Sequence, residues 1–382
     1  MIYLDHAATT PLDERVLDAM LPYLRDQFGN ASSVHVMGQA ARRAIDRARA
    51  EVADLIGAEP SEIVFTSGGT EADNLAVAGL LGARRDGRRA VVTSRIEHHA
   101  VLHACQAAER RGSPLALLAP DRRGRLDPEA FRETVGDDTA LVTVMAAQNE
   151  LGTIEPVREI ADIAHRRGAL VHSDAVQICG QMPVDVGDLG VDALTLTAHK
   201  FYGPKGVGAL YLRRATPIDP AQLGGGQERG RRAGTENVAG IVGFGAAARI
   251  AAAELTERAA RIRTLRDRLW QALRDLPGAE RLGDPDHCLP GHLPVRFAGV
   301  DGEALVLNLD LHCVCASMGS ACGSGSLEAS HVLTAIGLDA ASAREGLRLT
   351  VGKENTEAEI DEAARILRSI VERQRELTGS HG

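Results

Sequence analysis

The chain has 382 residues, of which 44% are hydrophobic and 25% are charged, a composition that suits a globular protein with a large core. Its formal net charge of −9, without a basic stripe to neutralise phosphates, argues against a protein that binds nucleic acid directly. The sequence shows no signal peptide, and we expect no apolar run long enough to span a bilayer, so a cytoplasmic, non-membrane protein is expected.

Strand-like and helix-like patterns alternate from about residue 60 to residue 215, which is typical of a mainly parallel sheet flanked by helices. The expected strands lie at residues 62–65, 90–93, 140–145, 169–172, 192–197 and 207–212. The expected helices lie at residues 70–81, 98–110, 156–167 and after the Asp127-Pro128 start signal. A glycine-rich segment, residues 224–230, then interrupts this alternation.

The rest of the chain predicts a second, smaller domain. A helical stretch at residues 235–276 is expected to link the two domains. The elements expected after it are a strand at residues 293–297, a helix from Asp301, a strand at residues 347–350 and a helix from Thr356. We predict an α/β protein with a large domain at 16–258, built on a mainly parallel sheet of the seven-stranded type, and a smaller α+β domain made of 1–15 and 259–382.

Six cysteines in a chain of this length do not make a disulfide framework. Cys313 and Cys315, followed by Cys322, fit no standard zinc spacing, and only His312 and His331 lie nearby as further ligands. We therefore predict no metal site. Cys313 and Cys315 alternate in a strand-like stretch and are expected to be small core residues.

Lys200 follows one apolar strand pattern, and Asp174 ends an earlier one. A lysine among apolar neighbours is costly, because desolvation disfavours its charged form and lowers its pKa, unless the amine is bound covalently as an imine. Pyridoxal phosphate enzymes need such a lysine for a Schiff base and an acid that keeps the pyridine nitrogen protonated. Taken alone, Lys200 favours the alternative of a surface lysine in a Gly/Pro loop.

The segment Ser67-Gly68-Gly69-Thr70 joins a strand to a helix N-terminus, where free amides and the helix dipole favour an anion. Alone it is a weak signal, since a simple N-cap has the same sequence. Together with a Schiff-base lysine it predicts a phosphate site, which Thr197 and His199 approach from beside Lys200.

Polar side chains follow several other strands, and ligands of parallel sheets collect at the carboxyl ends of strands. His98 or His99 is expected over this edge, where an imidazole could stack on a cofactor ring and move protons; for His99 we favour a capping or solvated role. Asn149 and Gln177 follow two further strands and can hydrogen-bond a cofactor oxygen or a substrate carboxylate. Each residue taken singly is also explained as part of a loop turn.

Cys322 lies in a run of tiny residues, 317–326, that offers few apolar groups to fix it, so we expect a mobile segment. A thiol there either attacks a bound substrate and carries its product outward, or is an incidental exposed cysteine. Arg348 alternates with leucines on a late strand. It either reaches solvent or presents its two-pronged guanidinium to a carboxylate in the cleft between the domains.

With these residues assembled, the chain resembles the cysteine desulfurases, within the class V aminotransferase group of fold-type I pyridoxal phosphate enzymes. The resemblance covers nearly the whole chain, and the joint order of its motifs is highly specific. The segments that carry it are residues 3–11, 65–74, 97–101, 148–153, 173–177, 198–200, 224–237 and 319–322.

The resemblance implies a role for each candidate residue. Lys200 forms the Schiff base with pyridoxal 5′-phosphate and later moves protons at the substrate Cα, Asp174 pairs with the pyridine nitrogen, and Cys322 accepts the sulfur. The resemblance also implies that Gln177 contacts the ring oxygen, and that His98 stacks on the ring and takes part in acid–base steps. The phosphate would be held by Gly69, Thr70, Thr197 and His199, and Thr235 would reach the phosphate of the neighbouring subunit of a homodimer. Asn149 and Arg348 would bind the substrate carboxylate.

The implied reaction converts L-cysteine to L-alanine and a persulfide on Cys322, which a sulfur-acceptor protein collects for iron–sulfur cluster assembly or tRNA thiolation. Two rivals remain. One is another enzyme of this fold, such as a selenocysteine lyase, a pyridoxal phosphate lyase or an aminotransferase. A cysteine desulfurase needs Cys322 as the acceptor thiol, whereas release of selenide can proceed without it. The other is a binding or scaffold protein without catalysis, against which Lys200 and Asp174 both count.

Overall fold

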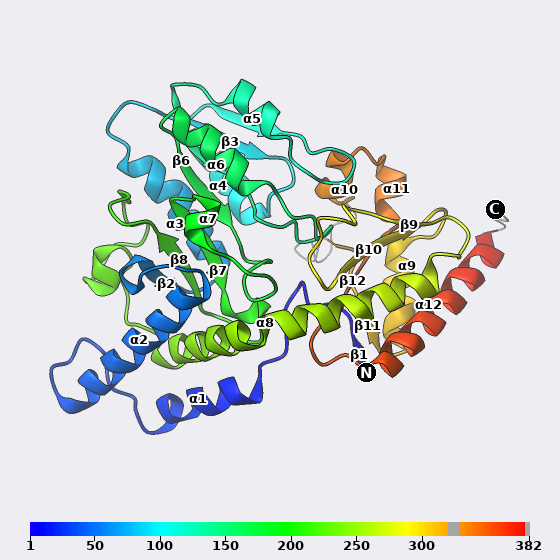
Figure 1. Cartoon of the computed structure of the whole chain (residues 1–382), viewed down its shortest axis with the longest axis horizontal. Coiled ribbons are helices and arrows are strands. Elements are labelled where there is room, and N and C mark those ends of the chain that lie inside the picture. The colour runs from blue at the N-terminus through cyan, green and yellow to red at the C-terminus, as the bar shows by residue number, and fades with distance from the viewer. Residues whose placement is uncertain (320–328, 379–382) are drawn as a thin grey trace.

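The computed structural model describes residues 1–319 and 329–378. Its larger lobe is built on a seven-stranded sheet with the order β2-β8-β7-β6-β5-β3-β4 (Figure 1). The strands are β2 (Ile63–Thr66), β3 (Ala90–Ser94), β4 (Leu115–Leu118), β5 (Thr139–Thr143), β6 (Leu170–Asp174), β7 (Ala193–Thr197) and β8 (Gly208–Leu212). Neighbours from β7 through β4 pair in parallel, whereas β8 pairs antiparallel with both β7 and β2. The predicted, mainly parallel α/β sheet is therefore confirmed.

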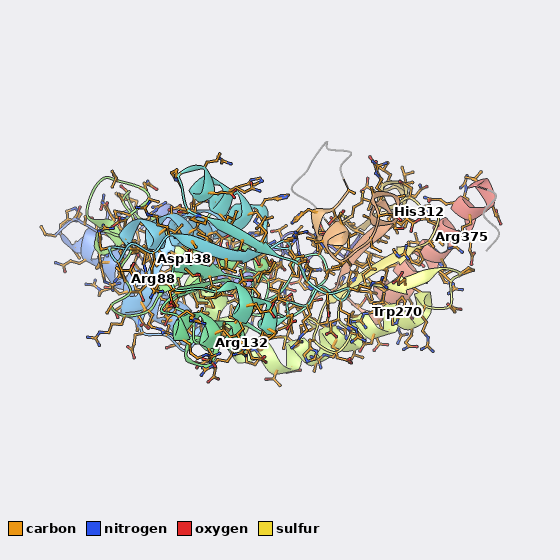
Figure 2. All side chains as sticks on the ribbon, turned by 90° about the horizontal axis from the view of Figure 1, so that it is seen from above. Arg88, Arg132, Asp138, Trp270, His312 and Arg375 are labelled. Atoms are coloured by element: carbon orange, nitrogen blue, oxygen red, sulfur yellow. The ribbon has the colours of Figure 1, made fainter. Side chains whose placement is uncertain are left out.

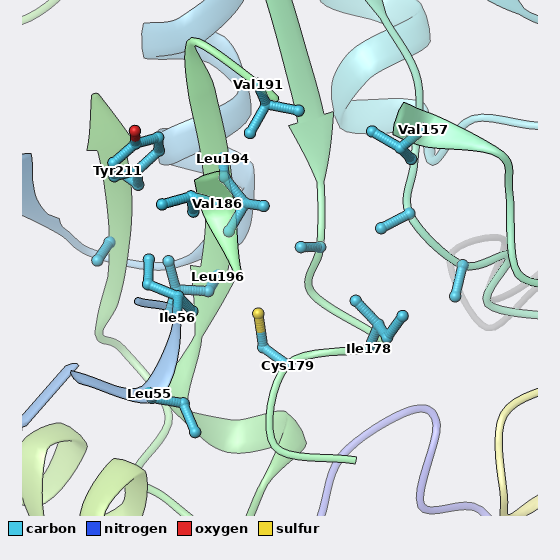
Figure 3. Close-up of a cluster of buried hydrophobic side chains, with 14 of the residues drawn as sticks. Leu55, Ile56, Val157, Ile178, Cys179, Val186, Val191, Leu194, Leu196 and Tyr211 are labelled. Carbon is cyan, nitrogen blue, oxygen red and sulfur yellow. The ribbon is translucent and has the colours of Figure 1, made fainter. Parts of the chain in front are cut away.

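Helices cover both faces of this sheet because its strands bury side chains on both sides. One face packs against α3 (Gly69–Ala83) and α4 (His99–Arg110). The opposite face packs against α2 (Val36–Leu55), α5 (Pro128–Thr134), α6 (Val157–Arg166) and the first part of α8 (Val238–Leu273). Figure 3 shows part of this second layer, in which Ile56, Leu194, Leu196 and Cys179 gather in one cluster. The short helix α7 (Val186–Leu189) adds Val186 to it, and α1 (Glu14–Arg25) packs on α8.

The smaller lobe has its own core. Its strands are β1 (Ile2–Tyr3), β9 (Ala279–Arg281), β10 (His292–Phe297), β11 (Val314–Cys315) and β12 (Gly346–Thr350). Its helices are α9 (Gly302–Leu311), α10 (His331–Ala335), α11 (Ala340–Arg344) and α12 (Glu357–Thr378). The order β12-β10-β9 is antiparallel, while β1 pairs in parallel with β11 and so brings the start of the chain into this lobe.

Helix α8 runs from one lobe to the other, as Figure 1 shows, and its residues belong to two different cores. Its first part joins the core of the large lobe, and Leu265, Leu269 and Leu273 join that of the small lobe. Figure 2 shows the same arrangement from above, with Arg88 and Arg132 labelled on the large lobe and Trp270 and His312 on the small one. The division into 16–258 and 1–15 with 259–382 stays a prediction, because Leu289 and Val332, both within 259–382, pack in the core of the large lobe.

Three expectations from the sequence need correction. Helix α8 does contain an 18-residue window that is long and apolar enough to cross a membrane, but 61% of that window is buried inside the protein, as in a core helix. Strand β4 was missing from the expected strands; it is the edge strand of the sheet, and none of its four residues is fully buried. Cys313 is exposed at a positive φ of 57° rather than in the core, and Cys315 is only half-buried.

Candidate active site

A cavity of about 290 Å³ lies at the carboxyl ends of the parallel strands, where the two lobes meet. Chain segments that are far apart in the sequence supply its walls. The lining includes ten of the predicted site residues, namely Gly69, Thr70, His98, Asn149, Asp174, Gln177, Thr197, His199, Lys200 and Arg348. The remaining lining residues are Ala7, Ala8, Asp73, Met145, Val176 and Gly319.

Lys200 ends a 3-10 turn, Ala198–Lys200, that directly follows β7. Its Nζ donates a hydrogen bond to the carbonyl oxygen of Ala8 at 2.9 Å and another to the carbonyl oxygen of Ala7. The adjacent His199 contacts Thr9 through Nδ1 and Oγ1 at 3.1 Å. The first residues of the chain therefore form one wall of the cavity and hold the amine at its surface.

Asp174 ends β6 and is buried, with Oδ1 accepting a hydrogen bond from the backbone N–H of Val176 at 2.9 Å. Burial raises the pKa of Asp174 to about 6, while that hydrogen bond and the charge of Lys200 oppose the rise. A cation placed against this carboxylate would stabilise its charged form. The site is therefore suited to a protonated ring nitrogen.

A buried polar network beneath the cavity was not found from the sequence. His172 of β6 contacts Thr143 Oγ1 at 2.8 Å and Thr195 Oγ1 at 3.0 Å, so strands β5, β6 and β7 are joined. Asp73 of α3 lines the cavity, and its Oδ1 lies 3.7 Å from His172 Nε2. Burial and the nearby Asp174 raise the pKa of Asp73 well above its usual value. The sequence does contain a signal for this network, because Thr143, His172 and Thr195 are polar residues within otherwise apolar strands.

Helix α3 begins at Gly69 and points its first residues into the cavity. A Cβ at Gly69 would come within 2.9 Å of Val176 Cγ2, so glycine allows the backbone to approach this wall closely. Thr70 and Thr197 lie beside it on the same wall, and Thr197 Oγ1 donates to the carbonyl oxygen of Val207 at 3.1 Å. Free amides at the start of a 15-residue helix make this end of the cavity suitable for a phosphate.

His98, rather than His99, caps helix α4: its Nδ1 accepts a hydrogen bond from the backbone N–H of Ala100 at 3.1 Å. Because Nδ1 is an acceptor there, the ring proton belongs on Nε2. Burial, followed by the charge of Lys200, lowers the pKa of His98 to about 4, so its imidazole is neutral near pH 7. The ring of His99 instead stacks on His103 at 5.1 Å between centroids.

Arg348 on β12 is buried and lines the cavity, so the alternative in which it reaches solvent is wrong. Its Nη1 donates to the carbonyl oxygens of Asn149 and Gly319, each at 3.0 Å, and its Nη2 donates to Asp5 Oδ1 at 2.8 Å. Within the described part of the chain, Arg348 Nε has no hydrogen-bond partner although it is buried. A guanidinium held in this way can bind a carboxylate that enters the cavity.

Gln177 follows β6, and its Nε2 donates to the carbonyl oxygen of Ala7 at 3.0 Å. Its Oε1 is buried without a hydrogen-bond partner among residues 1–319 and 329–378. Thr235 does not line this cavity; it is exposed and lines a separate hollow with Ser67 and Arg232. Cys322 lies outside the described residues. Over those same residues, no group of three His, Cys, Asp or Glu side chains is arranged to hold a metal.

The cavity fits pyridoxal 5′-phosphate on four observations. A lysine amine and a buried carboxylate share its wall. A helix N-terminus with a close-packed glycine lies at the same wall. A buried amide oxygen of Gln177 lacks a partner in the described chain, and the buried Arg348 also faces the cavity. These side chains and backbone groups therefore match a protonated aromatic ring that carries a phosphate group, together with a substrate that carries a carboxylate.

Comparisons with known proteins agree with this reading. The aminotransferase class-V family model matches residues 2–363. A cysteine desulfurase IscS of Methanosarcina thermophila is 45% identical over 99% of this chain and 93% of its own length, and a putative cysteine desulfurase IscS 1 of Bacillus subtilis is 45% identical over 97% and 99%.

Solved structures show the same fold over nearly the whole chain. A NifS-like protein superimposes with a TM-score of 0.92 at 38% identity, covering 97% of this chain and 99% of that one. A NifS-like protein from Rickettsia africae gives a TM-score of 0.88 at 31% identity with the same coverage. The chain therefore belongs to the class-V aminotransferase family, within its cysteine desulfurase group, and its cofactor is pyridoxal 5′-phosphate.

Proposed function

We propose that this enzyme removes the sulfur of L-cysteine, giving L-alanine and a persulfide on Cys322. The observation that carries the proposal is one cavity whose walls hold the Lys200 amine, the buried Asp174 carboxylate and the buried Arg348 guanidinium. The relatives that match the whole chain are named cysteine desulfurases, which supports the choice of substrate.

The positions of the lining residues support the cofactor contacts that we propose. Lys200 would hold pyridoxal phosphate as a Schiff base, and Asp174 would keep its ring nitrogen protonated. The other contacts proposed are Gly69, Thr70, Thr197 and His199 to the phosphate, His98 to the ring face and Gln177 to the ring oxygen. Thr235, exposed outside this cavity, would reach the phosphate of a second subunit, which implies a homodimer.

When bound, the cofactor supplies an electron sink for bonds at the substrate Cα. Arg348 and Asn149 bind the carboxylate of cysteine and so fix the direction of its side chain. Lys200 takes the Cα proton, and the neutral His98 imidazole takes part in the acid–base steps as a donor, through the proton on its Nε2. The Cys322 thiolate attacks the substrate sulfur, so the Cβ–S bond breaks, an S–S bond forms and a proton completes the methyl group of alanine.

We further propose that the persulfide is collected in the cytoplasm by an acceptor protein for iron–sulfur cluster assembly or tRNA thiolation. The relatives named IscS support the first of these routes.

Alanine formation from L-cysteine tests the proposal in four proteins: wild type, Lys200→Ala, Cys322→Ala and Lys205→Ala. Lys205 is exposed five residues from Lys200 and serves as the matched control. Lys200→Ala should form no alanine, and Lys205→Ala should match wild type. If Cys322→Ala released sulfide from L-cysteine at the wild-type rate, the result would favour a lyase that needs no acceptor thiol, such as a selenocysteine lyase.

A further inference from the structure

The turn that carries Lys200 is held by Thr10, a buried residue that does not itself line the active-site cavity. The Oγ1 of Thr10 donates a hydrogen bond to the carbonyl oxygen of His199 at 3.0 Å, and the backbone N–H of Thr10 donates to the same oxygen at 2.9 Å. The same Oγ1 accepts the backbone N–H of Tyr202 at 2.7 Å. One buried hydroxyl is therefore hydrogen-bonded to the backbone on both sides of Lys200.

The backbone of Tyr202 shows why this turn needs support. Its φ is +69°, in the left-handed region that a bulky residue adopts only at a cost in free energy, so surrounding contacts must hold it there. Its carbonyl oxygen accepts the N–H of Asp13 at 3.0 Å, and its Oη accepts the N–H of Lys353 at 2.7 Å. The Lys353 ammonium also lies 4.4 Å from the centre of the buried Tyr202 ring. The strained residue is thus fixed by the start of the chain and by the segment that follows β12.

The amine of Lys200 is held by the same part of the chain as its backbone. Its Nζ donates to the carbonyl oxygens of Ala7 and Ala8, which lie just before Thr10 in the sequence. Residues 7–10 therefore contact the amine through two carbonyl oxygens and the backbone of its turn through one hydroxyl. These contacts lie at the two ends of a long side chain, and together they fix where the amine lies in the cavity.

We infer that Thr10 is a positioning residue for Lys200, because its hydroxyl fixes the turn from which the amine reaches the substrate Cα. The inference rests on the proposed function, in which Lys200 is the base that takes the Cα proton. Proton transfer requires the base to lie within hydrogen-bond distance of the proton, and a misplacement of about 1 Å can cost about a hundredfold in rate. A shift of this turn should therefore slow proton transfer while the substrate carboxylate is bound as before.

The contact requires a hydroxyl, because one oxygen atom both donates and accepts a hydrogen bond. A serine in place of Thr10 can make both bonds, whereas a valine of similar shape makes neither and leaves the N–H of Tyr202 without this acceptor. Thr10→Ser should therefore keep the function that Thr10→Val loses. Thr139→Val is the matched control, because Thr139 is also buried and its Oγ1 accepts the N–H of Gly136 at the amino end of β5, away from the cavity.

Three measurements on the holoenzyme test the inference. The first is the rate at which the Cα proton of L-alanine exchanges for deuterium in deuterium oxide, which needs no acceptor thiol. In this exchange the Cα–H bond breaks, its proton passes to the Lys200 amine while the bound cofactor holds the electron pair, and a deuteron returns to the same carbon. The second is the dissociation constant of L-alanine, followed by the absorbance of the bound cofactor. The third is amide hydrogen exchange of the peptide that contains Tyr202, which reports on the turn and requires no reaction.

We expect Thr10→Val to slow deuterium incorporation into L-alanine by about tenfold or more while L-alanine binds as in wild type. The amides of its Tyr202 peptide should exchange faster, because one of them has lost its acceptor. Thr10→Ser and Thr139→Val should stay close to wild type in all three measurements. Tyr202→Phe, which removes the acceptor of the Lys353 N–H and keeps the ring, should also slow deuterium incorporation. The Tyr202→Phe result carries the test if Thr10→Val does not fold.

Wild-type rates of deuterium incorporation in Thr10→Val and Tyr202→Phe, or equal losses in Thr10→Val and Thr10→Ser, would overturn the inference alone. A parallel loss of deuterium incorporation and L-alanine binding would overturn it as well, since the defect would then lie in binding. A wild-type enzyme that exchanges the Cα proton of L-alanine but forms no alanine from L-cysteine would instead reject the proposed function and leave the positioning role of Thr10 in place.

Discussion

Arg348 Nη2 donates a hydrogen bond to Asp5 Oδ1 at 2.8 Å, although the two residues lie 343 positions apart in the chain. The guanidinium is buried on the cavity wall, and an unpaired buried charge would be costly. Asp5 therefore holds Arg348 in place before a substrate arrives. The first turn of the chain is in this way part of the proposed substrate site.

Replacing Arg348 with lysine should weaken binding of the substrate carboxylate. A lysine offers one point charge and cannot keep the contacts to Asp5, Asn149 and Gly319 at once. We expect the KM for L-cysteine to rise about tenfold or more, while the cofactor absorbance stays the same. Arg365→Lys on the exposed face of α12 is the control, and an unchanged KM in Arg348→Lys would contradict this role.

Replacing Asp174 with asparagine should remove the charge that keeps the ring nitrogen protonated. The rate of alanine formation should fall by about a hundredfold or more, because charge developing on the ring is no longer stabilised. Asp174→Glu, which retains a carboxylate, should keep more activity than Asp174→Asn. Equal rates for wild type and Asp174→Asn, with full cofactor occupancy by absorbance, would exclude the assigned contact.

Glu97 gives a pH dependence of stability whose sign can be stated. Its side chain is buried and accepts from Ser94 Oγ at 2.5 Å, and burial raises its pKa from 4.5 to about 8. Between these values the unfolded chain has lost this proton while the folded chain keeps it. The stabilisation is therefore complete below pH 4.5 and is lost as the pH rises towards 8.

Urea unfolding across this pH range checks that expectation. From pH 5 to pH 8, the free energy of unfolding of wild type should fall by a few kcal/mol relative to that of Glu97→Gln. The size of this change follows from the linkage of about 1.4 kcal/mol per pH unit. Glu109→Gln, at an exposed position of α4, should keep the wild-type slope. A wild-type slope in Glu97→Gln would show that Glu97 is ionised in the folded protein.

The buried ion pair between Arg49 and Glu228 should contribute to stability far more than surface pairs do. Arg49 donates two hydrogen bonds of 2.7 Å to the Glu228 carboxylate, which also accepts the N–H of Phe65 at 3.0 Å. Glu228→Ala leaves the Arg49 charge buried without this partner and should cost about 3–5 kcal/mol in urea unfolding. Removing Glu362 from its exposed pair with Arg365 should lower the free energy of unfolding far less, because water and salt screen a surface pair. Equal losses in the free energy of unfolding for Glu228→Ala and for removal of Glu362 would contradict a larger contribution from the buried ion pair.

The sequence was sufficient for every strand of the large sheet except β4, and for most cavity residues, because both follow from local patterns. Buried apolar runs mark the strands, and polar residues at strand ends meet at one edge of a parallel sheet. Contacts between distant segments were not predictable in this way. Examples are the Ala8 carbonyl bound by Lys200 and the Asp5 carboxylate that pairs with Arg348.

Two other differences have local causes. Cys313 was expected to be buried because it alternates with Cys315, but the backbone turns to a positive φ at Cys313 and exposes it. The His172 network stayed hidden because a polar residue on an interior strand has no partner in its own segment. Its partners, Thr143 and Thr195, come from the neighbouring strands.

The most direct test of the account is mass spectrometry of the wild-type holoenzyme after one turnover with L-cysteine. We predict that the peptide carrying Cys322 gains one sulfur atom while one equivalent of alanine forms, and that Lys200→Ala shows neither product. Alanine without sulfur on that peptide, or full turnover by Lys200→Ala, would contradict the account.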